Sequence, residues 1–95
     1  MGVVTGEAKV LKSLNDVHKL NVGDILITKA TSPDWTPFIH ASSGVVTELG
    51  GSLSHAAIVC REYGIPAVVG AKGATKLIKD GVKVTVYGTN GTIEY

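Results

Sequence analysis

Short runs rich in valine and isoleucine alternate with turn residues along the chain, which is typical of strands separated by tight connections. The runs expected as strands are 2–13 (one long or bent strand, broken by Gly6), 22–29 after an initial turn, 44–49, 66–70 and a terminal hairpin made of 82–88 and 91–95. Helical stretches are short and fall at 14–20, 31–42, 55–63 and 74–79. This alternation predicts one mixed α/β domain over residues 1–95, with mixed sheets and short helices.

Two of these helices have identifiable boundaries. The stretch HAAIVCREY should end at Gly64, with Pro66 just beyond it. The stretch 31–42 contains two prolines, and we interpret Asp34 as its N-cap. Pro37 then falls at the third helical position, whose N–H has no intrahelical partner.

Composition and charge exclude several classes of protein. The chain is 44% hydrophobic and 18% charged, so it should fold around a single core. A net charge of +1 and scattered aromatic residues do not favour a nucleic-acid or membrane surface. No apolar run is long enough to span a bilayer, and no secretory leader opens the chain. A single cysteine, Cys60, cannot form an internal disulfide, which favours a cytoplasmic location.

The sequence GGSLSH at 50–55 carries the most distinctive chemistry. A helix that begins here offers unpaired backbone N–H groups and the positive end of its dipole. Gly50 and Gly51 leave room for an approaching group, and Ser52 and Ser54 can cap the helix or donate to an anion, which is typical of a phosphate-binding arrangement. The positive field should keep the imidazole of His55 neutral and nucleophilic near neutral pH. His55 is therefore a candidate phosphoryl acceptor.

Spacing alone leaves a simpler interpretation open, in which His55 is a surface residue, the serines form an N-cap and the glycines form a turn. Other chemistries fit less well. The GxSxG pattern of a hydrolase nucleophile is absent, His55 and Cys60 alone do not make a zinc site, and GIPAVVGAKGATK lacks the GxxxxGK[ST] order of a nucleotide-binding loop.

The run TELGGSLSHAAIVCREYGIPAVVG at 47–70 closely resembles the phosphohistidine signature of the mobile domain of phosphoenolpyruvate (PEP)-utilising enzymes, a family that includes pyruvate, water dikinase, pyruvate, phosphate dikinase and rifampicin phosphotransferase. The resemblance continues through GDILITKATSPDWTPFIHASSGVVTE at 23–48 and GATKLIKDGVKVTV at 73–86. It implies a swivelling β/β/α phosphohistidine domain whose histidine carries a phosphoryl group between active sites on other domains.

The same resemblance implies roles for individual residues. His55 matches the phosphorylated histidine, and Gly50, Gly51 and Ser54 match its flanking loop, which also holds Ser52. Thr36, after SPDW, falls near the position where relatives place a threonine whose hydroxyl helps to orient the histidine ring.

The expected partners and cofactors are inferred from the binding groups that this sequence does not contain. Phosphoryl transfer needs Mg²⁺ and groups that hold phosphates, and no carboxylate cluster or nucleotide loop is evident. We therefore expect no cofactor on this domain. Mg²⁺ and ATP or PEP should bind an ATP-grasp-type nucleotide-binding domain and a PEP/pyruvate-binding or acceptor-binding domain, on the same chain or a separate one. The alternative is a non-catalytic regulatory or interaction module that retains the fold.

Four further side chains have predicted positions. Leu53 lies between two serines and should be at least half exposed, as a docking residue for a partner domain, unless it folds back onto the helix as a hydrophobic staple. Cys60 should lie in the core, and His18 and His40 should lie on the surface, away from the motif.

Overall fold

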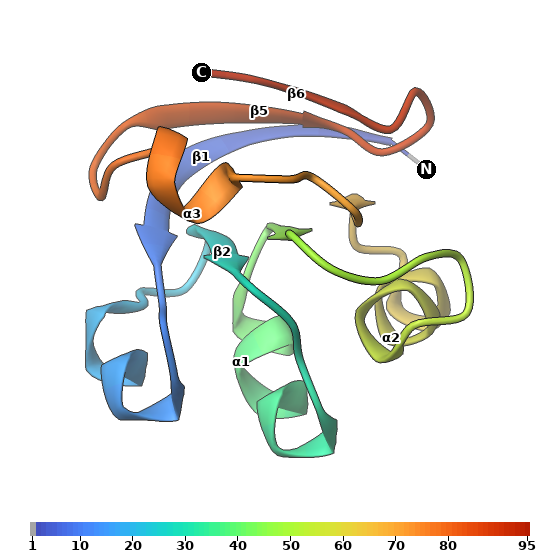
Figure 1. The fold of residues 1–95 in the computed structure, drawn as a ribbon, viewed down its shortest axis with the longest axis horizontal. Coiled ribbons are helices and arrows are strands. Elements are labelled where there is room, and N and C mark those ends of the chain that lie inside the picture. Colours follow the sequence, from blue (N-terminus) through green and yellow to red (C-terminus); the bar gives the residue numbers. More distant parts are fainter. Residues whose placement is uncertain (1) are drawn as a thin grey trace.

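The computed structural model describes residues 2–95, in which six strands form one mixed sheet with the order β4-β3-β2-β1-β5-β6 (Figure 1). The strands are β1 (Val3–Val10), β2 (Ile25–Thr28), β3 (Gly44–Thr47), β4 (Ala67–Val68), β5 (Lys83–Tyr87) and β6 (Thr92–Glu94). The helices are α1 (Thr36–Ala41), α2 (His55–Tyr63) and α3 (Ala74–Leu77), with 3-10 turns at η1 (Leu14–Lys19) and η2 (Pro33–Trp35). Strands β1 to β4 are parallel, whereas β5 and β6 pair antiparallel.

Strand β1 belongs to both halves of the sheet. It pairs antiparallel with β5 up to Glu7 and parallel with β2 from Ala8 onward. The prediction of one long strand is confirmed, but the break predicted at Gly6 is wrong, because the strand runs through this residue. A Cβ at Gly6 would lie 3.0 Å from the carbonyl oxygen of Gly23, so glycine here permits a close approach of the two backbones rather than an interruption.

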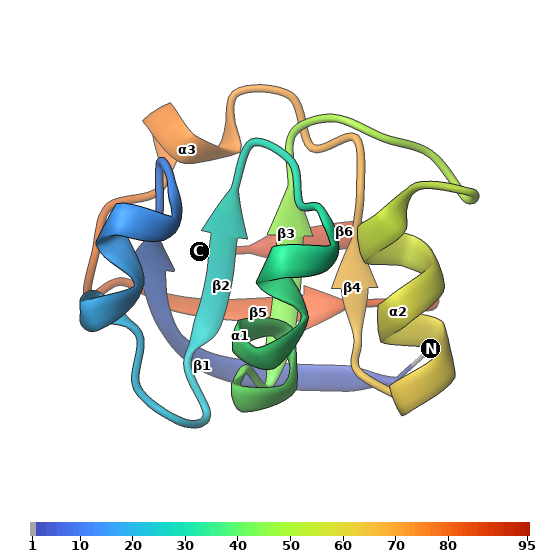
Figure 2. The same ribbon diagram turned by 90° about the horizontal axis from the view of Figure 1, so that it is seen from below.

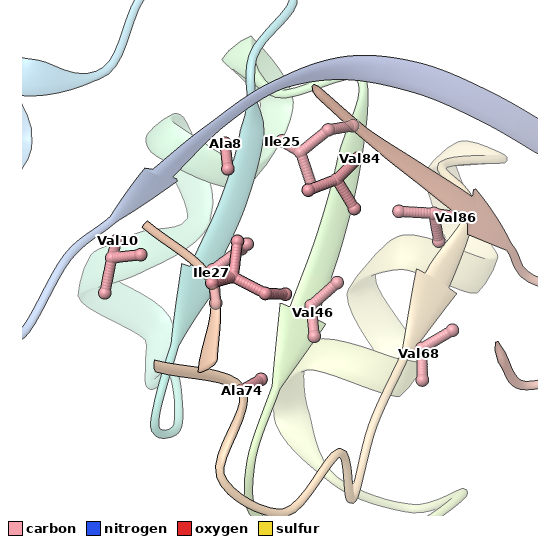
Figure 3. Close-up of a cluster of buried hydrophobic side chains, with 10 residues drawn as sticks. Ala8, Val10, Ile25, Ile27, Val46, Val68, Ala74, Val84 and Val86 are labelled. Carbon is pink, nitrogen blue, oxygen red and sulfur yellow. The ribbon is translucent and has the colours of Figure 1, made fainter. Parts of the chain in front are cut away.

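Two hydrophobic cores lie on the two faces of the parallel strands, and together they give the predicted β/β/α layers. Figure 2 shows β1 and β5 crossing over the parallel strands, with α1 and α2 on the opposite face. The buried strand β2 serves both cores, since Ile25 and Ile27 pack toward β5 and Leu26 packs toward the helices. Side chains of β2 to β5 meet between the two strand layers (Figure 3). Period-two alternation thus buries both faces of the central strands.

The helix boundaries follow the sequence pattern at α2 and depart from it at α1. Helix α2 spans the predicted residues and ends at Gly64, which has φ +70°. Asp34 is not an N-cap, because it lies inside the η2 turn that starts at Pro33. Proline favours the first position of a helical turn, so the turn begins two residues earlier than predicted, with Ser32 as its N-cap. Pro37 still lies in the first turn of α1, where it removes no hydrogen bond.

Several other elements are shorter in the structure than predicted. Strand β3 ends at Thr47, β4 contains only two residues, and α3 ends at Leu77. The terminal hairpin forms as predicted from β5 and β6. Within residues 2–95, no helix has the length and apolar character needed to cross a membrane.

Candidate functional site

His55 is the first residue of α2, at the end of the molecule toward which the parallel strands point (Figure 2). Ser54 is the N-cap, and its hydroxyl accepts a hydrogen bond from the N–H of Ala57 at 3.4 Å. This satisfies one of the donors that a helix start leaves unpaired, as the sequence pattern predicted. The His55 side chain is half-buried.

Two threonine hydroxyls approach the imidazole of His55 at its two ring nitrogens. The Thr31 hydroxyl oxygen lies 2.8 Å from Nδ1, whereas the Thr36 hydroxyl oxygen lies 3.5 Å from Nε2. The first distance is a good hydrogen bond and the second is at the outer limit of one. The structure therefore brings the predicted Thr36 to the ring, but Thr31 makes the closer contact.

The sequence pattern did not single out Thr31, which lies in the stretch before the prolines. The signal that could have found it is strand direction. Strands β2 and β3 are parallel neighbours, and parallel strands end at the same edge of a sheet. Thr31 follows β2 and the histidine motif follows β3, so the two loops meet.

The two glycines of the motif have different steric environments. Gly50 has φ +104°, and a Cβ there would lie 2.7 Å from the Cβ of Ser54. A Cβ added at Gly51 would meet no atom within 4 Å, and Gly51 has no positive φ. The backbone of Gly50 is also close to Gly70, since a Cβ on Gly70 would lie 3.3 Å from the Gly50 carbonyl oxygen. Of the two motif glycines, only Gly50 is therefore required by the conformation of the loop.

The remaining loop residues face solvent. The guanidinium of Arg61, on the second turn of α2, donates to the carbonyl oxygen of Ser52 at 3.0 Å and ties the loop to the helix. Ser52 makes this contact through its backbone, and its side chain is not the N-cap. Leu53 is 83% exposed, as expected for a residue outside the core, and Leu49 in the same loop is 53% exposed. The histidine thus lies next to an apolar surface.

A small cavity of about 90 Å³ adjoins the ring, and its lining residues include Ala30, Thr31, Gly50 and His55. No cluster of three or more histidine, cysteine or acidic side chains suited to a metal ion occurs within residues 2–95. The arrangement offers a half-buried imidazole, a helix start and open space beside them.

Comparison with known proteins decides the family. Residues 20–91 match the family described as PEP-utilising enzyme, mobile domain. The chain belongs to this family. The mobile domain is 53% identical over 93 residues to rifampicin phosphotransferase of Bacillus cereus and 50% identical over 93 residues to phosphoenolpyruvate synthase of Aeropyrum pernix. The two matches cover 98% and 97% of this chain but only 11% of each relative.

A solved structure supports the fold of the mobile domain. The solution structure of Enzyme I superposes with a TM-score of 0.70 and 32% sequence identity, over 83% of this chain and 33% of that chain. The predicted swivelling-domain fold class, with mixed strands and short helices, is confirmed. The relatives are several times longer than this chain, so they contain other domains.

Three residues outside the motif lie where the sequence predicted. Cys60 is 1% exposed in the core against the helices, and burial raises the pKa of its thiol to about 11. A thiol with so high a pKa is a poor nucleophile at neutral pH. His18 and His40 are both exposed, and the ring of His40 packs 3.9 Å from that of Tyr63, centroid to centroid.

Proposed function

We propose that the mobile domain is a phosphoryl carrier in which His55 is transiently phosphorylated. The observation that carries this proposal is the unequal engagement of the two ring nitrogens, 2.8 Å from Thr31 at Nδ1 and 3.5 Å from Thr36 at Nε2. A histidine whose Nδ1–H donates to a hydroxyl keeps its lone pair on Nε2. We infer that Nδ1 of His55 carries the proton and donates to the Thr31 hydroxyl, and we therefore assign Nε2 as the nucleophile.

Phosphoryl transfer to His55 forms one bond to phosphorus and breaks another. The Nε2 lone pair forms a bond to phosphorus while the bond from phosphorus to the leaving oxygen breaks, and that oxygen keeps the electron pair. The new phosphoryl group carries negative charge at the start of α2, where the helix dipole and unpaired N–H groups favour an anion. The same helix end thus presents the imidazole before transfer and favours the charged product after it.

The phosphoryl donor and acceptor belong to other domains in this proposal. The shuttle runs between a nucleotide site, of the ATP-grasp type, and a site for PEP and pyruvate or another acceptor. Mg²⁺ and the substrate phosphates would be held there, because such transfer needs cations around the phosphates. The names of the relatives, a phosphotransferase and a phosphoenolpyruvate synthase, support both kinds of acceptor. A buried, unpaired cysteine is consistent with a reducing compartment such as the cytoplasm.

The alternative is a regulatory or interaction module that has kept the fold without the chemistry. Such a module has no need of a half-buried histidine between two hydroxyls, and this geometry favours the carrier. The two functions differ in whether His55 takes up a phosphoryl group.

Labelling tests the carrier function directly. The donor protein is rifampicin phosphotransferase of Bacillus cereus from which the region similar to this chain has been removed, supplied with ATP that carries ³²P in its β- and γ-phosphates. A second donor is the equivalent truncation of Aeropyrum pernix phosphoenolpyruvate synthase with labelled PEP. We expect acid-labile, alkali-stable label on the mobile domain, located at His55 by mass spectrometry. Failure of both donors to label the chain contradicts the carrier function.

Replacing Thr31 by valine should slow labelling about tenfold, because an imidazole without its Nδ1 partner can turn or carry its proton on Nε2. Thr31→Ser keeps the hydroxyl and should retain most of the rate. Initial rates of labelling compare the two variants with the parent chain. Equal rates for valine and serine would show that the Thr31 hydroxyl does not position the ring.

The exposed Leu53 should act in docking rather than in folding. Leu53→Asp is expected to change the free energy of unfolding by less than about 0.5 kcal/mol, as for other surface substitutions, and to slow labelling by the donor protein severalfold. Val22→Asp is the matched control, since Val22 is 89% exposed and precedes β2, at the opposite edge of the sheet. A loss of about 2 kcal/mol in Leu53→Asp would place this side chain in the core instead.

A further inference from the structure

A basic cleft lies at the same edge of the sheet as His55. Its volume is about 370 Å³, and it is lined by Lys12, Lys29, Thr75, Lys76 and Lys79, which we call the lysine cleft. These residues come from the segments that follow β1 and β2 and from α3 with the loop after it. Nine basic residues are spread along a chain of net charge +1, so four of them in one cleft is a local concentration of charge.

The ammonium groups of the lysine cleft are free to bind an external anion. All four lysines are exposed, and within residues 2–95 none of them forms an ion pair. The nearby carboxylates are engaged elsewhere. Asp80 binds Lys19 at 2.7 Å, and Asp16 accepts the backbone N–H of Lys12.

Glu48 is an acidic group beside the lysine cleft. It accepts both the hydroxyl and the N–H of Thr75, and these bonds lower its pKa, with further lowering from Lys29 and Lys76. Glu48 therefore stays ionised and anchors α3 at this edge. Asp80 is neutralised by Lys19, so Glu48 and Asp16 stand against four ammonium groups and an excess of positive charge remains.

The lysine cleft and the histidine site adjoin each other. The N–H of Leu49 donates to the carbonyl oxygen of Lys29 at 2.9 Å, which holds the chain after β2 beside the chain after β3. Lys29 lines the lysine cleft, while the next two residues, Ala30 and Thr31, line the cavity at His55. A partner that covers one site necessarily approaches the other.

The donors in the lysine cleft suit a broad acidic surface better than a small anion. The hydroxyl and N–H of Thr75 are both used by Glu48, so neither of these fixed donors is available to a compact ligand. Lysine ammonium groups on flexible stems act as mobile point charges, which favours distributed pairing with several carboxylates. The exposed Leu77, on α3 between two of the lysines in the sequence, adds apolar contact area.

We propose that the lysine cleft docks an acidic face of the domain that exchanges the phosphoryl group with His55. This inference rests on the carrier function proposed above. Attraction between the two faces would orient the encounter so that Nε2 meets the phosphoryl group, and it would weaken as salt screens the charges.

A binding experiment tests the surface without any transfer. Poly-L-glutamate is titrated into the ¹⁵N-labelled chain and followed by NMR, with pyrophosphate in a parallel titration. We expect amide shifts at residues 12, 29 and 75–79 with poly-L-glutamate, lost at high salt and in the double variant Lys76→Gln/Lys79→Gln. The control Lys72→Gln/Lys83→Gln removes the same charge outside the cleft and should retain the shifts. Absence of these shifts, or saturable binding of pyrophosphate alone, overturns the proposal.

A transfer experiment then relates the surface to His55. The rate of labelling by the donor protein is measured against the concentration of the mobile domain. Lys76→Gln/Lys79→Gln should raise the half-saturating concentration about tenfold and leave the limiting rate unchanged, while the control pair changes neither. Equal behaviour of the two pairs refutes the docking surface and leaves the carrier function standing. If the parent chain takes up no label, the carrier function fails and the NMR titration alone decides whether the cleft binds carboxylates.

Discussion

Replacing His55 by alanine should reduce acid-labile label on the mobile domain below detection, the largest effect of any substitution in this chain. The imidazole supplies the bond to phosphorus, and a phosphate ester on the neighbouring hydroxyl of Thr31 or Thr36 would be acid-stable and would not count as this label. The fold should survive, because the variant loses one half-buried side chain and one good hydrogen bond, about 1 kcal/mol.

The control for this variant is His18→Ala, which removes an exposed histidine from η1. It should accept label at the parent rate. Circular dichroism establishes that both variants are folded, and mass spectrometry locates the label. Acid-labile label that persists in His55→Ala would falsify the assignment of this residue as the acceptor.

The second large effect is expected at Gly50. Gly50→Ala introduces a Cβ at 2.7 Å from that of Ser54, at a φ of +104° that other residues rarely adopt. Relief of this contact must move the backbone of the loop, and with it the cap of α2 and the ring of His55. We expect a loss of about 1–3 kcal/mol in the free energy of unfolding and a fall in labelling rate of about a hundredfold, since misplacement by about 1 Å is enough for such a loss.

Gly51→Ala provides a matched control one residue away. Its added methyl group meets no atom within 4 Å, and its backbone needs no positive φ. Denaturant unfolding and the labelling assay should therefore show little change for Gly51→Ala. If the two variants behave alike, the Gly50 conformation is not what holds the loop in place.

Local sequence pattern was sufficient for the elements of the fold but not for their arrangement. Helix α2 was predictable residue by residue, because a capping serine and a terminal glycine define both of its ends. The change of pairing partner along β1 was not, because it depends on where β2 and β5 lie in space. At Asp34 a favourable capping residue was overridden by Pro33, which starts the turn earlier.

Some residues of the candidate site could likewise be predicted from local sequence, whereas others are brought there only by the pairing of strands. The histidine, its capping serine and its glycines are contiguous in sequence, and the motif identified them together. Thr31 and Lys29 reach the site only through the parallel pairing of β2 with β3. The lysine cleft joins residues from three separate segments, so a count of charges along the chain gives a near-neutral total and hides it.

The continuity of β1 has a mechanical consequence. One strand is hydrogen-bonded to both layers, so bending one layer against the other requires breaking its ladder to β2 or to β5. If the domain acts as the proposed carrier, bending within residues 2–95 is therefore not expected to move the histidine. We expect the distance between donor and acceptor to be covered by a rigid-body rotation of the whole domain instead.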